Sequence, residues 1–141
     1  MRIWKILLLA ISLLLLLAAC GTREPELSPT EVVTRFYRWC IGYPGNPVAD
    51  REYRNNPDLA PSFIESVDAT LASMEGGGAD PLLLAQDIPE RFTADEAEVS
   101  GDRATVIVHF YWGGNDIPSS RGVELQLIDG AWLITGVQMV D

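Results

Sequence analysis

The stretch ATVIVHFYW, at residues 104–112, decides the fold of this chain. Ala, Val, Val, Phe and Trp occupy its alternate positions, and Thr, Ile, His and Tyr occupy the positions between them. A period of two with one strongly apolar set is typical of a β-strand that packs one face on a core. The other face of this expected strand carries His109, the one histidine of the sequence.

Three more strands are expected around this one. Gly101-Asp102 marks a turn from a short strand near residues 97–100. Asp129-Gly130 is a strong hairpin signal, and it separates apolar stretches at residues 123–127 and 131–140. Because the connections are short, successive strands are expected to be antiparallel neighbours.

Two helices are expected before the strands. Ser28-Pro29-Thr30-Glu31 has the signature of a helix start, with a cap, a proline at the first position and a capping-box glutamate. Apolar residues at helical spacing follow, and Gly42 ends the pattern. A second helix is predicted over Pro61–Met74, and the apolar but irregular stretch Ala79–Arg91 is expected to pack on the core. Helices followed by antiparallel strands predict an α+β fold.

The N-terminus predicts export. Met1–Lys5 is basic, Ile6–Leu17 is almost wholly apolar, and two alanines follow. This is the layout of a secretory signal peptide, which we predict over residues 1–19. The alternative is a membrane-spanning helix, but the apolar run is shorter than the about 20 residues that spanning takes.

The end of that segment, Leu17-Ala18-Ala19-Cys20, resembles the lipobox of bacterial lipoproteins. The resemblance implies cleavage before Cys20 and acyl chains such as palmitate on it, so that the chain meets a membrane through lipid. Residues 20–27 are then a tether. The expected location is the extracytoplasmic side of the cell envelope, on the outer membrane of a Gram-negative cell or otherwise on the outer face of the plasma membrane. A cleaved protein without lipid is the alternative.

The chain is acidic, with 20 acidic and 10 basic residues and a formal charge of −10. Two of the basic residues lie in residues 1–19, so their removal leaves 8 basic residues and a charge of −12. Such a charge excludes nucleic acid as a partner, because phosphates need a basic patch. The acids Asp80, Asp87 and Glu90 lack the spacing of a calcium loop, and one histidine with two cysteines leaves little material for a metal. We therefore expect no metal and no cofactor.

The order of elements resembles the nuclear-transport-factor-2-like, or cystatin-like, fold. In that fold, helices pack on a curved four-stranded antiparallel sheet around a cone-shaped cavity, and residues 28–141 would form such a domain. More narrowly, the motifs at residues 32–43, 43–53 and 80–89 resemble a family of bacterial envelope lipoproteins of unknown function. This resemblance implies a fold and a cellular location, and it implies no reaction.

Cys40 lies on the apolar face of the first predicted helix, where a buried thiol is inert. A pairing with His109 as a thiol nucleophile is the alternative. The resemblance adds that relatives carry a cysteine at the position of Leu84, which implies that Cys40 has lost that disulfide partner here.

His109 is the candidate catalytic residue, and Asp87 or Asp80 would be its carboxylate partner in an acid–base pair. The alternative is an ordinary strand histidine. Gln86 and Asp87 lie in the most distinctive motif and are expected either to line a cavity mouth or to satisfy the backbone of their loop. Only the first of these alternatives makes this region a site.

Three functions fit these patterns. The first is a non-catalytic, lipid-anchored domain that binds a small ligand or an envelope protein, with Trp39 and Tyr43 as candidates for the contact surface. The second is a small cavity enzyme, of lyase, isomerase or hydrolase type, that uses His109 and a carboxylate. The third is an inhibitor or immunity-type protein. An exposed apolar patch around Trp39 or the Gly113–Ser120 loop, over a filled core, would favour the third.

Overall fold

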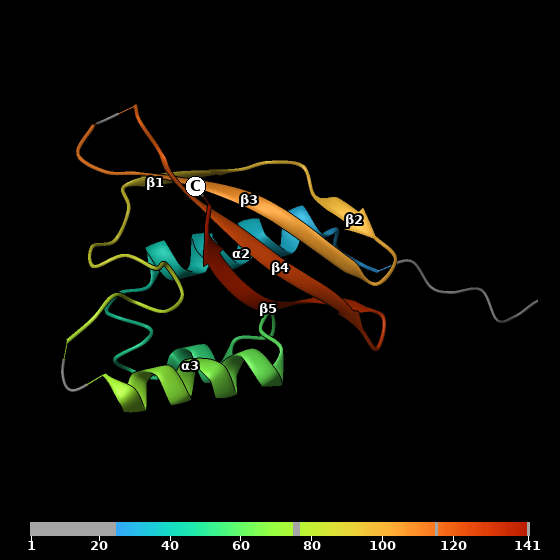
Figure 1. Ribbon diagram of the computed structural model, residues 1–141, viewed down its shortest axis with the longest axis horizontal. Coiled ribbons are helices and arrows are strands. Elements are labelled where there is room, and N and C mark those ends of the chain that lie inside the picture. The colour runs from blue at the N-terminus through green and yellow to red at the C-terminus, as the bar shows by residue number, and fades with distance from the viewer. Residues whose placement is uncertain (1–24, 75–76, 115, 141) are drawn as a thin grey trace, which may run out of the picture.

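The computed structural model describes residues 25–74, 77–114 and 116–140 (Figure 1). Two α-helices come first, with a short 3₁₀ helix between them: α2 (Pro29–Gly42), η1 (Glu52–Asn55) and α3 (Pro61–Ser73). Five strands follow: β1 (Arg91–Ala94), β2 (Glu98–Ser100), β3 (Arg103–Tyr111), β4 (Ser119–Ile128) and β5 (Ala131–Met139). The strands form one antiparallel sheet, so the expected α+β class is confirmed. The predicted signal peptide at residues 1–19 and the predicted lipidation site Cys20 lie outside the described residues. No helix within the described ranges is long and apolar enough to cross a membrane.

The strand order in the sheet is β1-β3-β4-β5, and β2 also pairs with β3. β1 lies along the last residues of β3, with Arg91 opposite Tyr111, whereas β2 lies along its first residues, with Ser100 opposite Arg103. The expectation of four strands was wrong because it missed β1. Four residues are too few to display a reliable period of two, and β1 is placed instead by its backbone ladder with β3.

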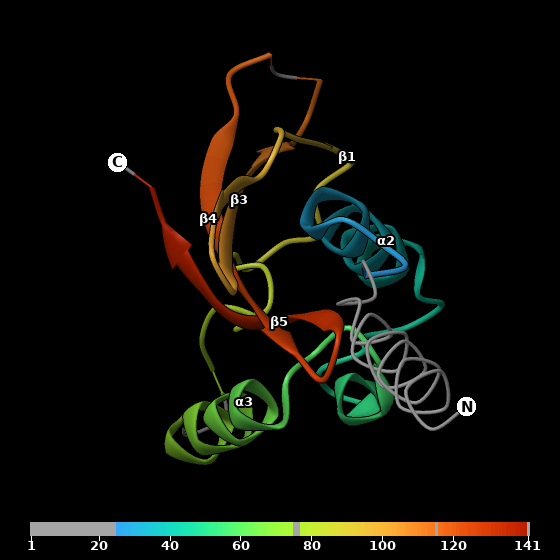
Figure 2. The ribbon, with the colours of Figure 1, turned by 90° about the vertical axis from the view of Figure 1, so that its right-hand side faces the viewer.

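The core lies between α2 and one face of the sheet. α2 contacts β1, β3 and β5 (Figure 2). The alternating apolar side chains of β3 point into this core and are buried: Ala104, Val106, Val108 and Phe110. α2 contributes the buried Phe36 and Tyr37, and the Tyr37 ring meets the Phe110 ring edge to face at 5.0 Å. Each such buried aromatic or aliphatic side chain stabilises the fold by roughly 1.5–3 kcal/mol.

The expected start of α2 is confirmed. The Ser28 hydroxyl accepts from the Glu31 backbone N–H at 3.3 Å, and the Glu31 carboxylate accepts from the Ser28 backbone N–H at 2.8 Å. This reciprocal capping box satisfies two backbone donors that the first turn leaves open. It fixes where α2 begins, and the buried apolar face of the helix then packs on the sheet.

α3 packs beside β5 rather than over the sheet (Figure 1). The segment before it runs along β5, because the Ile134 N–H donates to the Asp58 carbonyl at 2.8 Å and the Ala60 N–H donates to the Ile134 carbonyl at 2.9 Å. The helix then buries Phe63 and Val67. The predicted bounds differ from the observed ones only at Met74, which is the cap.

The irregular stretch at residues 79–91 packs on the core as expected. Leu82 and Leu83 are buried. The Tyr37 hydroxyl donates to the Leu82 carbonyl at 3.1 Å, and the Asp80 carboxylate accepts from the Leu82 N–H at 2.7 Å. A buried loop needs such partners, since its backbone groups have no ladder of their own.

Candidate functional site

His109 lies on the outer face of β3 and joins two polar partners. Its Nδ1 lies 2.7 Å from the Ser120 hydroxyl, and its Nε2 lies 3.1 Å from the Asp95 carboxylate. The expected pairing of His109 with Asp87 or Asp80 is therefore wrong. The register of the sheet explains this result, because β4 places Ser120 opposite His109 and the chain leaving β1 brings Asp95 to the other side of the ring.

The Ser120–His109–Asp95 series has the order of hydroxyl, imidazole and carboxylate that nucleophilic hydrolases use. Catalysis by such a series also needs a recess that holds the substrate and donors that stabilise its developing charge. Neither the pocket of about 390 Å³ nor the pocket of about 220 Å³ described below is lined by any of the three residues. The Asp95 carboxylate is largely exposed. The contacts tie β4 and the β1–β2 connection to β3.

Cys40 is a buried free thiol on the inner side of α2. Burial raises the pKa of this thiol, and the nearby Asp80 carboxylate raises it further. His109 faces outward from the sheet and its ring nitrogens bond elsewhere. The core role expected for Cys40 agrees with this geometry, and the alternative pairing with His109 does not.

Gln86 and Asp87 are both exposed. Gln86 lines a pocket of about 390 Å³ that lies between the end of α3 and the loop before η1, together with Val48, Leu71, Met74 and Asp80. Asp87 does not line it; its carbonyl accepts from the Trp112 indole N–H at 3.1 Å. Gln86 thus borders this pocket beside α3, whereas the Asp87 carbonyl ties its loop to the end of β3.

Trp39 and Tyr43 pack against each other at the end of α2. Their ring centroids are 5.9 Å apart, and Trp39 also lies 6.0 Å from the buried Phe36 ring. Both side chains are half-buried. They therefore cover the core edge and present only part of their area to a partner.

The exposed apolar side chains gather at one end of the sheet. The structure has five exposed large hydrophobic residues in its described part, and four of them lie beside the last residues of β3 or the first residues of β4: Ile88, Ile117, Met139 and Val140. We call this region the loop end. Sequence reasoning pointed to the Gly113–Ser120 loop, which contains Ile117, but missed the other three because exposure depends on what packs nearby.

The loop end is held by specific contacts. The Arg91 guanidinium bonds the Asp116 carboxylate at 3.0 Å and lies over the Tyr111 ring at 3.7 Å. Beneath these residues, the buried Arg121 guanidinium donates to the Leu83 and Leu84 carbonyls, each at 2.9 Å. Nothing in the sequence pattern indicated this role for Arg121, which precedes an expected strand as an ordinary basic residue.

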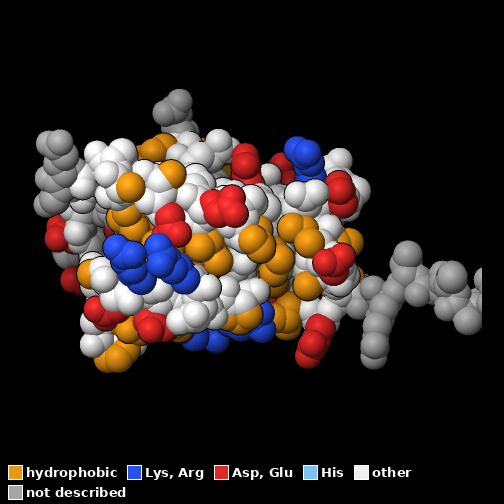
Figure 3. Space-filling view, turned by 90° about the horizontal axis from the view of Figure 1, so that it is seen from below, with side chains coloured by type: hydrophobic (Ala, Val, Ile, Leu, Met, Phe, Trp, Pro, Cys, Tyr) orange, Lys and Arg blue, Asp and Glu red, His pale blue; other side chains and the backbone are white. Residues whose placement is uncertain are grey.

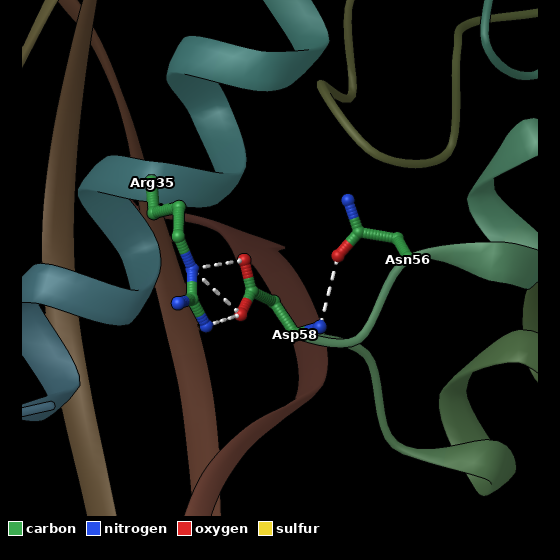
Figure 4. A network of polar contacts seen from close by, with 3 residues as sticks. All are labelled: Arg35, Asn56 and Asp58. Atoms are coloured by element: carbon green, nitrogen blue, oxygen red, sulfur yellow. Dashed lines mark hydrogen bonds and ion pairs between the residues drawn. The ribbon is translucent and has the colours of Figure 1, made fainter. Parts of the chain in front are cut away.

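A second polar cluster joins α2 to the segment before α3 (Figure 4). The buried Asp58 carboxylate accepts from Arg35 Nε at 3.1 Å and from a second nitrogen of the same guanidinium. The Asn56 side chain in turn accepts from the Asp58 backbone N–H at 2.9 Å. A pocket of about 220 Å³ lies beside it, lined by Pro25 and by the hairpin between β4 and β5. This cluster fixes the segment before α3 to α2.

No group of three or more His, Cys, Asp or Glu residues in the described ranges is arranged to hold a metal ion. Fold and site together describe an α+β domain whose sheet is packed on one helix and whose exposed apolar side chains gather at one end.

The sequence matches no known family model, and no curated protein is significantly similar to it. Two solved structures share its fold. A chain of the selenomethionine form of the type VI effector–immunity complex Tae3–Tai3 from Ralstonia pickettii has a TM-score of 0.62 and 24% identity, over 81% of this chain and 97% of that one. A chain of the native form of the same complex has a TM-score of 0.64 and 24% identity, over 81% and 96%.

Proposed function

We propose that this chain is an immunity-type protein, which binds a toxic effector protein and blocks it by surface contact without catalysing a reaction. The observation that carries the proposal is the fold it shares with a chain crystallised in an effector–immunity complex, because the match covers nearly all of that chain. The sequence left three functions open, and this one uses the observed features best.

Two features of the site support the proposal. Large apolar side chains fill the space between α2 and the sheet, so a ligand-holding cone is not needed to account for the core. In addition, exposed apolar residues gather at the loop end, as a protein-binding surface requires. A filled core and an exposed apolar surface both fit a protein-binding domain. A cavity enzyme would need neither of them.

The proposal includes the cellular location and the family that the sequence pattern predicts. Acylation of Cys20 would tether the domain outside the cytoplasm, where an effector arriving from a neighbouring cell would meet it. We also propose that the helix-on-sheet arrangement is a nuclear-transport-factor-2-like domain of an envelope lipoprotein family. The support for the address is the signal-peptide and lipobox pattern of residues 1–20.

The test is a competition between a strain that lacks this gene and its parent. The two are mixed on a solid surface, where cells touch, and in shaken liquid, where they do not. We expect the deletion strain to be lost on the surface only, and to recover when the gene is restored. Equal survival of both strains on the surface would overturn the proposed function.

A further inference from the structure

We propose that the loop end is the surface that binds the effector. The loop end would enter an apolar recess on the effector that is bordered by basic side chains. The inference rests on the proposed function and deepens it by naming the surface and the chemistry of the partner. Three observations carry it: where the apolar area is exposed, how it is held, and which charges surround it.

Apolar exposure is concentrated at the loop end. Ile117 is 76% exposed, Ile88 47%, Met139 57% and Val140 38%. The fifth exposed large hydrophobic residue of the described ranges, Val99, is 56% exposed and lies on β2, beside the first residues of β3. Isolated exposed hydrophobic residues are ordinary, but four from three different segments at one end mark a contact surface.

The loop end is braced before any partner arrives. The Trp112 indole ties the 87–90 segment to the end of β3, and the Glu90 N–H donates to the Tyr111 carbonyl at 3.0 Å. The ion pair between Arg91 and Asp116 holds the loop that carries Ile117. A surface ordered in advance loses little conformational entropy on binding, so its apolar area contributes more fully to affinity.

The charges around the loop end are mainly acidic. Asp87 and Glu90 are exposed there, and Asp116 and Arg91 offset each other's charge in their ion pair, so the loop end keeps an acidic excess. The whole chain also carries a formal charge of −10. A partner with Lys or Arg side chains around an apolar recess matches this surface and would be steered toward it. A second copy of the chain does not match it, since the same acids would face one another.

The side that carries α3 is a poorer match for such a partner. Viewed from below, its hydrophobic side chains lie among both acidic and basic ones (Figure 3). Its cations include Arg51, which is exposed and lines the pocket at the end of α3. A basic partner would meet like charges on this side, whereas exposed carboxylates border the loop end.

The loop end also points away from the tether. The described chain starts at Pro25, which lines the pocket beside the β4–β5 hairpin, at the opposite end of the sheet (Figure 1). β3 has nine residues, so about 30 Å separates the two ends of the sheet. A domain anchored through residues 20–27 would therefore hold the loop end away from the bilayer, where a soluble effector can reach it.

The experiment uses the competition assay with restored variants of the full chain. Ile88→Arg and Ile117→Arg each place a cation where the partner is inferred to be apolar and basic, and Val99→Arg is the matched control on an exposed residue away from the loop end. Loss of a central interface contact weakens affinity by about thirtyfold or more. We therefore expect both loop-end variants to leave the strain as vulnerable as the deletion, and Val99→Arg to protect fully.

A charge-reversal pair tests the chemistry of the partner. Asp87→Lys with Glu90→Lys should reduce protection, whereas Glu96→Lys with Glu98→Lys should not. Circular dichroism and thermal unfolding of each purified variant should match the wild type, because all these positions are exposed.

The outcomes separate the two proposals. If the wild type does not protect, the proposed function fails. If the wild type protects and the loop-end variants protect equally well, the proposed function stands and this surface is wrong. If the charge-reversal variants protect as the wild type does, the inferred basic partner is wrong. A purified wild type that sediments as a dimer, with a dimer that Ile117→Arg dissolves, would show that the loop end binds a second copy instead.

Discussion

Replacing Arg121 with methionine tests how the loop end is supported. The guanidinium is buried and donates to four oxygens, namely the Leu83 and Leu84 carbonyls and the Ser120 carbonyl at 2.9 Å each and the Ser119 hydroxyl at 2.7 Å. Methionine keeps most of the side-chain volume and donates no hydrogen bond. The Leu83 and Leu84 carbonyls then lose the guanidinium that holds the 81–85 loop to β4.

The size of the effect follows from two opposing contributions. Leaving a buried acceptor without a partner costs about 1–3 kcal/mol, so the Leu83 and Leu84 carbonyls together account for roughly 2–6 kcal/mol. Removing a charge that burial disfavours, as the lowered pKa of Arg121 indicates, returns part of this loss. We therefore expect Arg121→Met to lower the free energy of unfolding by about 3 kcal/mol.

Urea unfolding followed by tryptophan fluorescence measures this loss. With a urea dependence of about 1–3 kcal/mol per molar, the midpoint should fall by roughly 1–3 M. Arg103→Met is the matched control, because Arg103 lies on the neighbouring strand and is exposed; it should change stability by less than about 0.5 kcal/mol. A loss below about 1 kcal/mol for Arg121→Met would refute the argument that the guanidinium holds the loop.

Four further outcomes are expected. Burial raises the pKa of Asp80 above its unfolded value, so the stability of the wild type should fall as pH rises from about 4 through the folded pKa. Asp80→Asn should lack this fall, which urea titrations from pH 4 to 7 can measure. A difference in stability between the two proteins that stays constant over this range would contradict the argument. In the Cys20→Ser protein, where Cys40 is the one remaining thiol, a disulfide reagent should react with Cys40 only after denaturation, and rapid reaction of the native protein would overturn its buried state. A fluorophosphonate probe should not label Ser120, because the Asp95 carboxylate beside His109 is largely exposed to solvent and the proposed function needs no nucleophile; labelling that His109→Ala abolishes would establish an enzyme instead. Cys20→Ala should abolish metabolic labelling with an alkyne fatty acid, and unchanged labelling would rule out the lipid anchor.

Local patterns predicted the elements that local physics controls. The capping box at Ser28 predicted where α2 begins, because that motif closes within a single turn of chain. The alternation of residues 104–112 predicted the inner and outer faces of β3, because successive side chains of a strand point to opposite faces. β1 escaped prediction, since its four residues, two of them exposed and two half-buried, carry too little pattern of their own.

At the candidate site, too, the sequence predicted the local feature and missed the contact between distant residues. Sequence alone placed His109 on the outer face of its strand, but it offered Asp87 and Asp80 as partners, and the observed partner is Asp95. Which carboxylate meets the histidine depends on how β1 and β4 align with β3, and that alignment joins residues distant in the chain.

By itself, the sequence determined the α+β class, the period-two face of β3, the helix start at Ser28 and an acidic surface. Each of these depends on composition or on neighbours within a few residues. Only the tertiary structure decided that Arg121 supports the 81–85 loop and that Ile88, Ile117 and Met139 share one end of the sheet. Such contacts depend on strand register and on how loops close over the core, which are set by the packing of the whole chain at once.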